Sequence, residues 1–261
     1  MTELHATTGG ATVSGSPVIL LHGFGACADV WESVAAKLAG THASLAYDLP
    51  GHHRSMLADG VGGAGRMAKA ILTDLQARGL DRFHLVGHSM GGAVAALVAL
   101  RVPESTASLT LLAPGGFGPE INHRLLARYA SATTREEMRL ALEHMFGWNN
   151  VVPDRMIDTL VGLRQAEGAA EALRSILPSM TSEDGSGGKV QGMLPRDGLA
   201  TLTMPVKVLW GTQDRVLPTR QAHKLPPLFA AHVFEDTGHM LIEEQPDAVA
   251  TLIAQNLAAA R

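Results

Sequence analysis

The sequence predicts an α/β fold in which helices cover both faces of a mainly parallel sheet. Residues 17–21 form a short, continuously apolar run, as expected for a strand that is buried on both faces. Similar short strands then alternate with helical patterns, which is typical of parallel sheets with helical connections. We expect the other strands at residues 43–47, 83–86, 109–113, 206–210 and 232–234. Helices are expected between them at residues 31–38, 67–78, 91–100 and 246–259.

The alternation of strands and helices stops after Phe117. Only helical patterns follow, and we expect helices at residues 122–131, 135–146, 154–164 and 169–177. Residues 182–192 contain four glycines and two serines, a composition that is typical of a loop. We therefore expect an α/β core formed by residues 1–116 and 196–261, interrupted by a helical cap insertion at residues 117–195.

Composition limits the classes of function. The chain has 261 residues and a formal net charge of -4, so its charge predicts no binding to nucleic acid or to an anionic membrane. Cys27 is the only cysteine, which excludes an internal disulfide and fits a reducing compartment. The N-terminal segment lacks a basic stretch followed by an apolar run, and no run of about 18 apolar residues occurs. We expect a cytoplasmic protein, and a homodimer is possible.

The segment Gly87-His88-Ser89-Met90-Gly91 lies between an expected strand and an expected helix. A serine on such a tight turn projects its hydroxyl above the sheet, and the turn requires small residues two positions before and after it. The helix that follows directs its first amides and its dipole at any oxyanion formed there. We therefore expect Ser89 to be a nucleophile and the amide of Met90 to be an oxyanion donor. The alternative is a glycine-rich turn in which Ser89 only caps the helix.

A serine nucleophile needs a base, and the base needs a group that orients it. His239 follows the last expected strand, at the same carboxyl edge of the sheet as Ser89. Asp214 follows the strand at residues 206–210 and reaches that edge as well. The chain order Ser89, Asp214, His239 is a known order for such triads. We expect His239 to be the general base and Asp214 to be the acid that orients it. The alternatives are that His239 is an ordinary loop histidine and that Asp214 is a turn residue.

Five segments together resemble the α/β-hydrolase superfamily. They extend over nearly the full chain in the order of that superfamily: LLHGFG at residues 20–25, YDLPGHHRS at 47–55, GHSMGG at 87–92, GTQDRVLP at 211–218 and TGHM at 237–240. The resemblance implies an eight-stranded sheet with a helical cap after the sixth strand. It also implies that Phe24 donates the second oxyanion amide and that His22 holds this loop. Relatives commonly have glycine at the position of His53, so His53 is strained if that position needs a positive φ.

The segment TLLAPGGFGPEIN at residues 110–122 resembles a narrower group. It is similar to the hydrolase-like module in the dihydrolipoamide acetyltransferase component of acetoin dehydrogenase systems. Those proteins usually carry a lipoyl domain before this module, whereas the hydrolase pattern here starts at about residue 17. We expect a serine hydrolase that cleaves a small carboxylic ester or thioester through an acyl-enzyme on Ser89. The alternatives are an acyltransferase of an acetoin or lipoyl-type system, a carbon–carbon bond hydrolase, and a catalytically silent binding protein.

The expected substrate is a small molecule with an acyl group, and no cofactor is needed. Gly25 and His88, beside the predicted oxyanion loop and nucleophile, and Trp148 in the insertion are the candidates for contact with the substrate. The apolar helices of the insertion favour a small and largely apolar substrate.

Two further patterns do not predict a site. Residues 60–65 match G-x-G-x-x-G, but a dinucleotide site needs a buried strand directly before the motif, and residues 54–59 do not form one. His52 and His53 have no carboxylate or thiol at ligand spacing, so we expect no metal site.

Overall fold

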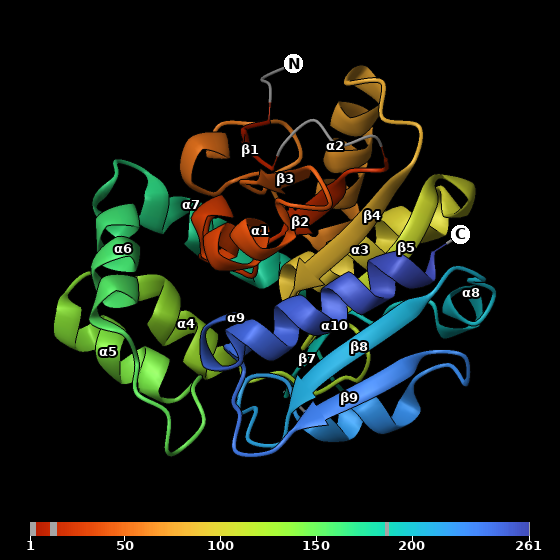
Figure 1. The fold of residues 1–261 in the computed structure, drawn as a ribbon. Helices are drawn as coiled ribbons and strands as arrows, with labels where there is room; N and C mark the ends of the chain where they lie inside the picture. The colour runs from red at the N-terminus through yellow and green to blue at the C-terminus, as the bar shows by residue number, and fades with distance from the viewer. Residues whose placement is uncertain (1–3, 11–14, 186–187, 261) are drawn as a thin grey trace.

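The computed structural model describes residues 4–10, 15–185 and 188–260 (Figure 1). Its main sheet has seven strands in the order β1-β3-β2-β4-β5-β8-β9. The strands are β1 (Ala6–Gly9), β2 (Val18–Leu21), β3 (Ser44–Tyr47), β4 (Phe83–His88), β5 (Thr106–Leu112), β8 (Val206–Gly211) and β9 (Ala230–Phe234). All neighbours run parallel except β1, which pairs antiparallel with β3. The predicted α/β class, its parallel sheet and the six predicted strands are confirmed.

The strand count differs from the eight that the resemblance implied, because the described residues form seven strands in this sheet. β1 was not predicted from the sequence, and the reason is its place at the sheet edge. Its residues are half-buried or exposed, so the strand carries no apolar run. Backbone pairing with β3 alone defines it, and such pairing leaves no local pattern.

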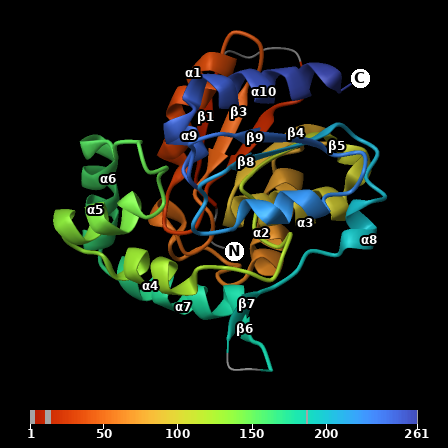
Figure 2. The same cartoon turned by 90° about the horizontal axis from the view of Figure 1, so that it is seen from below.

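The molecule has three layers, which Figure 2 shows along the sheet. α1 (Glu32–Leu38) and α10 (Pro246–Ala259) lie on one face, and α2 (Ala64–Ala77) and α3 (Met90–Arg101) lie on the other. Because helices cover both faces, every residue of β2, β4 and β5 is buried. Nine of the twelve residues of α3 are buried as well, so the helix that follows Ser89 is fixed in the centre of the molecule.

Short helices lie in the connections and were not predicted. They are α8 (Arg196–Leu199), α9 (Leu241–Glu244) and the 3₁₀ helices η1 (Ala28–Trp31), η2 (His53–Ser55), η3 (Pro103–Ser105), η4 (Leu177–Met180) and η5 (Thr219–Lys224). Helices of this length are too short to show a hydrophobic period in the sequence.

Four helices of eight or more residues lie in the described part of the segment between β5 and β8, at the predicted places. They are α4 (His123–Ser131), α5 (Arg135–Glu143), α6 (Asp154–Gln165) and α7 (Ala169–Ile176). A capping box starts α5: Thr134 Oγ1 accepts from the Glu137 amide, and the Glu137 carboxylate accepts from the Thr134 amide. In Figure 1 the four helices gather beyond the end of the sheet toward which the parallel strands point. The division into a core and a cap at residues 117–195 stays a prediction.

The prediction of a loop at residues 182–192 is wrong. β6 (Thr181–Glu183) pairs antiparallel with β7 (Lys189–Gln191) in a small hairpin, and residues 186–187 of this stretch lie outside the described residues. The side chain of Gln191 accepts from the Gly116 amide at 2.9 Å and donates to the Gly118 carbonyl at 2.7 Å. This contact with the loop after β5 anchors the hairpin, and local composition does not reveal it.

Two further features of the described residues concern membrane-spanning helices and Cys27. Among residues 4–10, 15–185 and 188–260, no helix has both the length and the apolar character needed to cross a bilayer. Cys27 is free and buried, and burial raises the pKa of its thiol to about 12.

Candidate active site

Ser89 stands on a strained turn between β4 and α3. Its backbone has φ 54° and ψ −116°, a conformation that costs a non-glycine residue free energy. The turn is so tight that a Cβ atom on Gly87 would lie 2.3 Å from the carbonyl oxygen of Gly91. A Cβ on Gly91 would lie 2.3 Å from the carbonyl of Leu21. The predicted need for small residues on both sides of Ser89 is confirmed.

His239 and Asp214 form a buried pair at the same edge of the sheet. His239 Nδ1 donates to Asp214 Oδ2 at 2.8 Å. The other carboxylate oxygen, Oδ1, accepts from the amides of Val216 and Leu217 at 2.8 Å each. With its proton on Nδ1, the imidazole keeps Nε2 free to accept a proton.

The loop that carries His239 is bound to the segment after α5. The amide of His239 donates to the carbonyl of Met145 at 2.6 Å. A Cβ on Gly238 would lie 2.4 Å from that same carbonyl oxygen, so only glycine fits at this position. The carboxylate of Glu244 accepts from the amides of Gly238 and Gly147, which joins both segments again. The position of His239 therefore depends on residues on both sides of the β5–β8 connection.

Ser89 and His239 line one small cavity, which we call the catalytic chamber. Its volume is about 30 Å³, and Gly23, Phe24 and His88 also line it. The structure thus brings together Ser89, His239 and the loop predicted to hold the oxyanion.

Both predicted oxyanion donors lie beside Ser89. Met90 is the first residue of α3, so its amide has no acceptor within the helix. Phe24 lies in the loop after β2 and lines the catalytic chamber. His22 holds this loop as the resemblance implied: it is fully buried, its Nε2 accepts from the Leu49 amide at 2.9 Å, and its Nδ1 donates to the Gly23 carbonyl at 2.7 Å.

The amide and the carbonyl of Gly25 are both bound to other residues. The amide donates to His52 Nε2 at 3.0 Å, and the carbonyl accepts from the Tyr129 hydroxyl at 3.2 Å. Tyr129 belongs to α4, so this helix holds the loop after β2 from outside. The predicted contact of Gly25 with substrate therefore does not go through its amide.

Arg164 on α6 places a buried charge behind the same loop. Only 5% of this residue is exposed, and its guanidinium carbon lies 4.9 Å from the centroid of the Tyr129 ring. Its Nε and Nη2 have no hydrogen-bond partner among the described residues. Burial above all, and also the charge of Arg164, keep the pKa of His52 well below its usual value. A neutral His52 is the form that can accept the Gly25 amide.

The remaining predicted residues have different surroundings. His88 lines the catalytic chamber, and its Nε2 donates to the carbonyl of His239 at 2.9 Å. Burial lowers the pKa of His88 to about 3, so it stays neutral and supports the loop of His239. Trp148 is 72% exposed on the surface, and its role in substrate contact stays a prediction. His53 has φ 40°, which confirms the expected positive φ at this position.

A second cavity of about 260 Å³ opens on the other side of Ser89, and we call it the apolar chamber. Ser89 and Met90 line it together with Leu97 of α3. Met180 and Met193, which flank the β6–β7 hairpin, close it from the opposite side. Ser89 therefore lies between two chambers of different size.

Sequence reasoning missed Tyr129, Arg164 and Glu244, which support the loops of the site. No motif surrounds them, and only their three-dimensional contacts reveal their roles. Within the described residues, no group of three or more His, Cys, Asp or Glu side chains is arranged to hold a metal ion.

The profile of the family described as "Alpha/beta hydrolase family" matches residues 18–252. The chain belongs to this family. One curated relative is the dihydrolipoyllysine-residue acetyltransferase component of the acetoin cleaving system of Cupriavidus necator, which is 32% identical over 240 residues. The match covers 92% of this chain but 63% of the relative, so the chain spans less than two thirds of that protein. The monoacylglycerol lipase ABHD6 of Rattus norvegicus is 30% identical, with 92% and 75% covered.

Solved structures of alpha/beta hydrolases superpose on nearly the whole chain. The meta-cleavage product hydrolase CumD of Pseudomonas fluorescens has a TM-score of 0.83 at 21% identity, covering 99% of this chain and 95% of its own. The carboxylesterase CesB of Bacillus subtilis has a TM-score of 0.80 at 18% identity, with 100% and 93% covered. At these identities the likeness shows the fold.

Proposed function

We propose that the protein is a serine hydrolase that cleaves a small carboxylic ester or thioester through an acyl-enzyme on Ser89. The observation that supports this most is the catalytic chamber, which Ser89 and His239 line together. The hydrogen bond from His239 to Asp214 leaves Nε2 as the acceptor on that imidazole. A base with this tautomer beside a serine on a strained turn is the arrangement that nucleophilic acyl transfer requires.

The reaction takes place in two steps. His239 Nε2 takes the proton of the Ser89 hydroxyl as its oxygen bonds to the acyl carbon, and the bond to the leaving group then breaks. The leaving alcohol or thiol receives the proton from His239. Water later attacks the acyl carbon with His239 as the base again, the bond to the Ser89 oxygen breaks, and Ser89 takes the proton back from His239 as the acid is released. The amides of Met90 and Phe24 stabilise the oxyanion in both steps, each by about 3 kcal/mol.

The two chambers give the two parts of the substrate different places. The leaving group must lie on the side of His239, because His239 protonates it. His239 lines the catalytic chamber, so the acyl chain extends into the apolar chamber on the other side of Ser89. Leu97, Met180 and Met193 favour an aliphatic acyl group there. In this proposal residues 117–195 act as the cap that shapes both chambers and excludes water.

A second candidate function is transfer of the acyl group to an acceptor other than water. The likeness to the acetyltransferase component of the acetoin cleaving system favours it, because that likeness covers most of this chain. The transferase would use the same residues and differ in the acceptor that meets the acyl-enzyme. Release of free acid against release of acylated alcohol or thiol, measured with both acceptors present, separates the two.

Labelling with a fluorophosphonate probe tests the proposed function. We expect the wild-type protein to be labelled and the Ser89→Ala variant not to be, because only an activated serine reacts with the probe. Ester turnover should fall by roughly 10⁴-fold or more in Ser89→Ala. Equal labelling of both proteins, or turnover by the variant at the wild-type rate, would exclude Ser89 as the nucleophile.

A further inference from the structure

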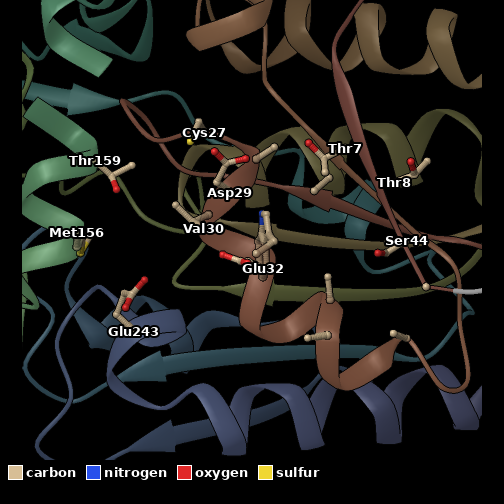
Figure 3. A pocket seen from close by; sticks show the side chains of 18 of the residues that line it. Thr7, Thr8, Cys27, Asp29, Val30, Glu32, Ser44, Met156, Thr159 and Glu243 are labelled. Carbon is tan, nitrogen blue, oxygen red and sulfur yellow. The ribbon is translucent and has the colours of Figure 1, made fainter. Parts of the chain in front are cut away.

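A large groove lies outside the catalytic chamber and is not used by the chemistry proposed so far. This outer groove has a volume of about 720 Å³. Figure 3 shows its lining: Met156 and Thr159 of α6 and Glu243 of α9 border one end, and Thr7 and Thr8 of β1 border the other. It therefore extends from α6 along α1 to the edge strand of the sheet.

The outer groove adjoins the catalytic chamber. Val30, Met156 and Glu243 line both cavities. At this junction Arg155 Nη2 donates to Glu243 Oε2 at 2.6 Å, which ties α6 to α9. A substrate arm that extended from Ser89 through the catalytic chamber would therefore enter the groove past these three side chains.

The direction of this path identifies which part of a substrate would occupy the groove. It starts on the side of His239, where the leaving group receives its proton. The catalytic chamber holds about 30 Å³, so only a thin, unbranched chain fits through it. The groove beyond it offers more than twenty times that space.

The outer groove has a largely apolar lining, and most of its charged side chains are acidic. Asp29, Glu32 and Glu243 face it, against one basic side chain, Arg155. Asp29 pairs with Arg54 at 2.8 Å and Glu243 pairs with Arg155, whereas Glu32 has no ion pair among the described residues. This charge distribution repels an anionic group and attracts a cationic one.

A buried donor in the groove lacks a partner. Trp31 lines the groove and is fully buried, and its indole Nε1–H has no hydrogen-bond partner among the described residues. A buried N–H without an acceptor is uncommon in folded proteins and costs about 1–3 kcal/mol. No water-sized atom reaches this N–H, so a ligand in the groove contacts it only if the indole ring turns.

We propose that the outer groove binds the leaving group of the substrate, a long unbranched alcohol or thiol arm with a neutral or cationic end. The inference rests on the proposed acyl-enzyme at Ser89, because that chemistry sets which side the leaving group takes. Substrates with an anionic arm are turned over less well, since Asp29, Glu32 and Glu243 face the arm.

Three butanoate esters with the same acyl group test the proposal. Their alcohols are ethanol, a long straight-chain amino alcohol, and a hydroxy acid of the same length. At low ionic strength we expect kcat/KM for the amino-terminated ester to exceed that for the carboxylate-terminated ester about tenfold, and this ratio should fall as salt is added.

Bulk in the groove should affect only the long esters. Thr159 is exposed on α6 and lines the groove but not the catalytic chamber. We expect Thr159→Trp to lower kcat/KM about tenfold or more for both long esters and to leave the ethyl ester within about twofold. Gln165→Trp is the matched control, because Gln165 is exposed on the same helix and lines neither cavity.

Reversal of one charge tests the acidic lining. Glu32→Lys should reduce or invert the preference for the amino-terminated ester, whereas Ser33→Lys should not, because Ser33 is exposed beside it but does not line the groove. Equal effects of Thr159→Trp on all three esters, or a preference for the carboxylate-terminated ester in the wild-type protein, would overturn the proposal.

Binding of the free amino alcohol, measured by calorimetry, separates this proposal from the catalytic one. If the proposed acyl chemistry fails, no ester is turned over, yet the amino alcohol still binds and Thr159→Trp weakens its binding. If only the groove proposal fails, the three esters are turned over with the same kcat/KM whatever the length and charge of their alcohol, and the free amino alcohol does not inhibit their turnover.

Discussion

The reactive groups and the walls of the site are built in different ways. Backbone atoms of the sheet and its loops fix the reactive groups: the glycines around Ser89 leave no room for a single added carbon atom. Side chains from the segment between β5 and β8 form the outer wall of the site, and Met193 in this wall is half exposed. Close backbone contacts tolerate almost no substitution, whereas an exposed wall can be replaced without disturbing the core. The type of reaction and the choice of substrate are therefore separable in this molecule.

The largest expected effect on kcat comes from a change to one of the reactive groups, Asp214. In Asp214→Asn, the amides of Val216 and Leu217 must still meet an oxygen, so the new NH₂ group faces His239 Nδ1. The imidazole then takes the wrong tautomer and Nε2 carries the proton. We expect kcat to fall by about 10⁴-fold with the melting temperature little changed. A loss below tenfold would show that Asp214 does not orient the base.

A wall variant should change selectivity and not the reaction. Met193→Trp reduces the apolar chamber, and we expect kcat/KM for octanoyl esters to fall about 10–100-fold while acetyl esters change little. Met193→Leu, which keeps the volume, is the control. Rates measured over a series of p-nitrophenyl esters give the comparison. Uniform loss along the series would mean that the acyl chain does not occupy this chamber.

Tyr129 joins the two regions and should have a smaller effect. Tyr129→Phe removes the hydroxyl that donates to the Gly25 carbonyl, and the oxyanion loop loses its link to α4. We expect kcat to fall about three- to tenfold with KM nearly constant, and the free energy of unfolding to fall by about 1 kcal/mol. An unchanged kcat would show that the loop needs no support from the insertion.

Acid should destabilise the core through its buried histidines. Burial lowers the pKa of His84 to about 4, whereas an unfolded chain has a histidine pKa of about 6.5. Between these values the unfolded chain binds a proton that the folded chain does not, so the free energy of unfolding falls as the pH falls. The slope is at most about 1.4 kcal/mol per pH unit for this residue.

Denaturant unfolding between pH 6.5 and 4.5 measures this slope. We expect His84→Gln to reduce the slope of unfolding free energy against pH by at most the amount that one histidine contributes. His144→Gln, at an exposed position after α5, should leave the slope unchanged. An identical slope in His84→Gln and the wild type would mean that His84 does not contribute.

The same comparison explains how far the sequence predicts the molecule. Ser89, Asp214 and His239 each follow a strand of a parallel sheet, so the sheet alone brings them to one edge, and local patterns reveal the strands. The helices α4 to α7 were also predicted, because each has an amphipathic period.

What could not be predicted depends on contacts between distant segments. The hairpin of β6 and β7 follows from the bonds of Gln191 to the loop after β5. The support of Gly25 by Tyr129 and His52 likewise joins residues 104 and 27 positions apart. No local composition records such partners, so the shape of both chambers had to come from the structure.

The bond between the amide of His239 and the carbonyl of Met145 has a consequence for hybrids made with related proteins. A graft of all of residues 117–195 would replace Met145 and Gly147, and with them the backbone to which the base is attached. A graft that starts after Gly147 would retain this attachment and Tyr129, yet still exchange α6 and the hairpin. The position of the graft boundary would therefore decide whether a hybrid that gains a new substrate specificity also keeps its catalytic rate.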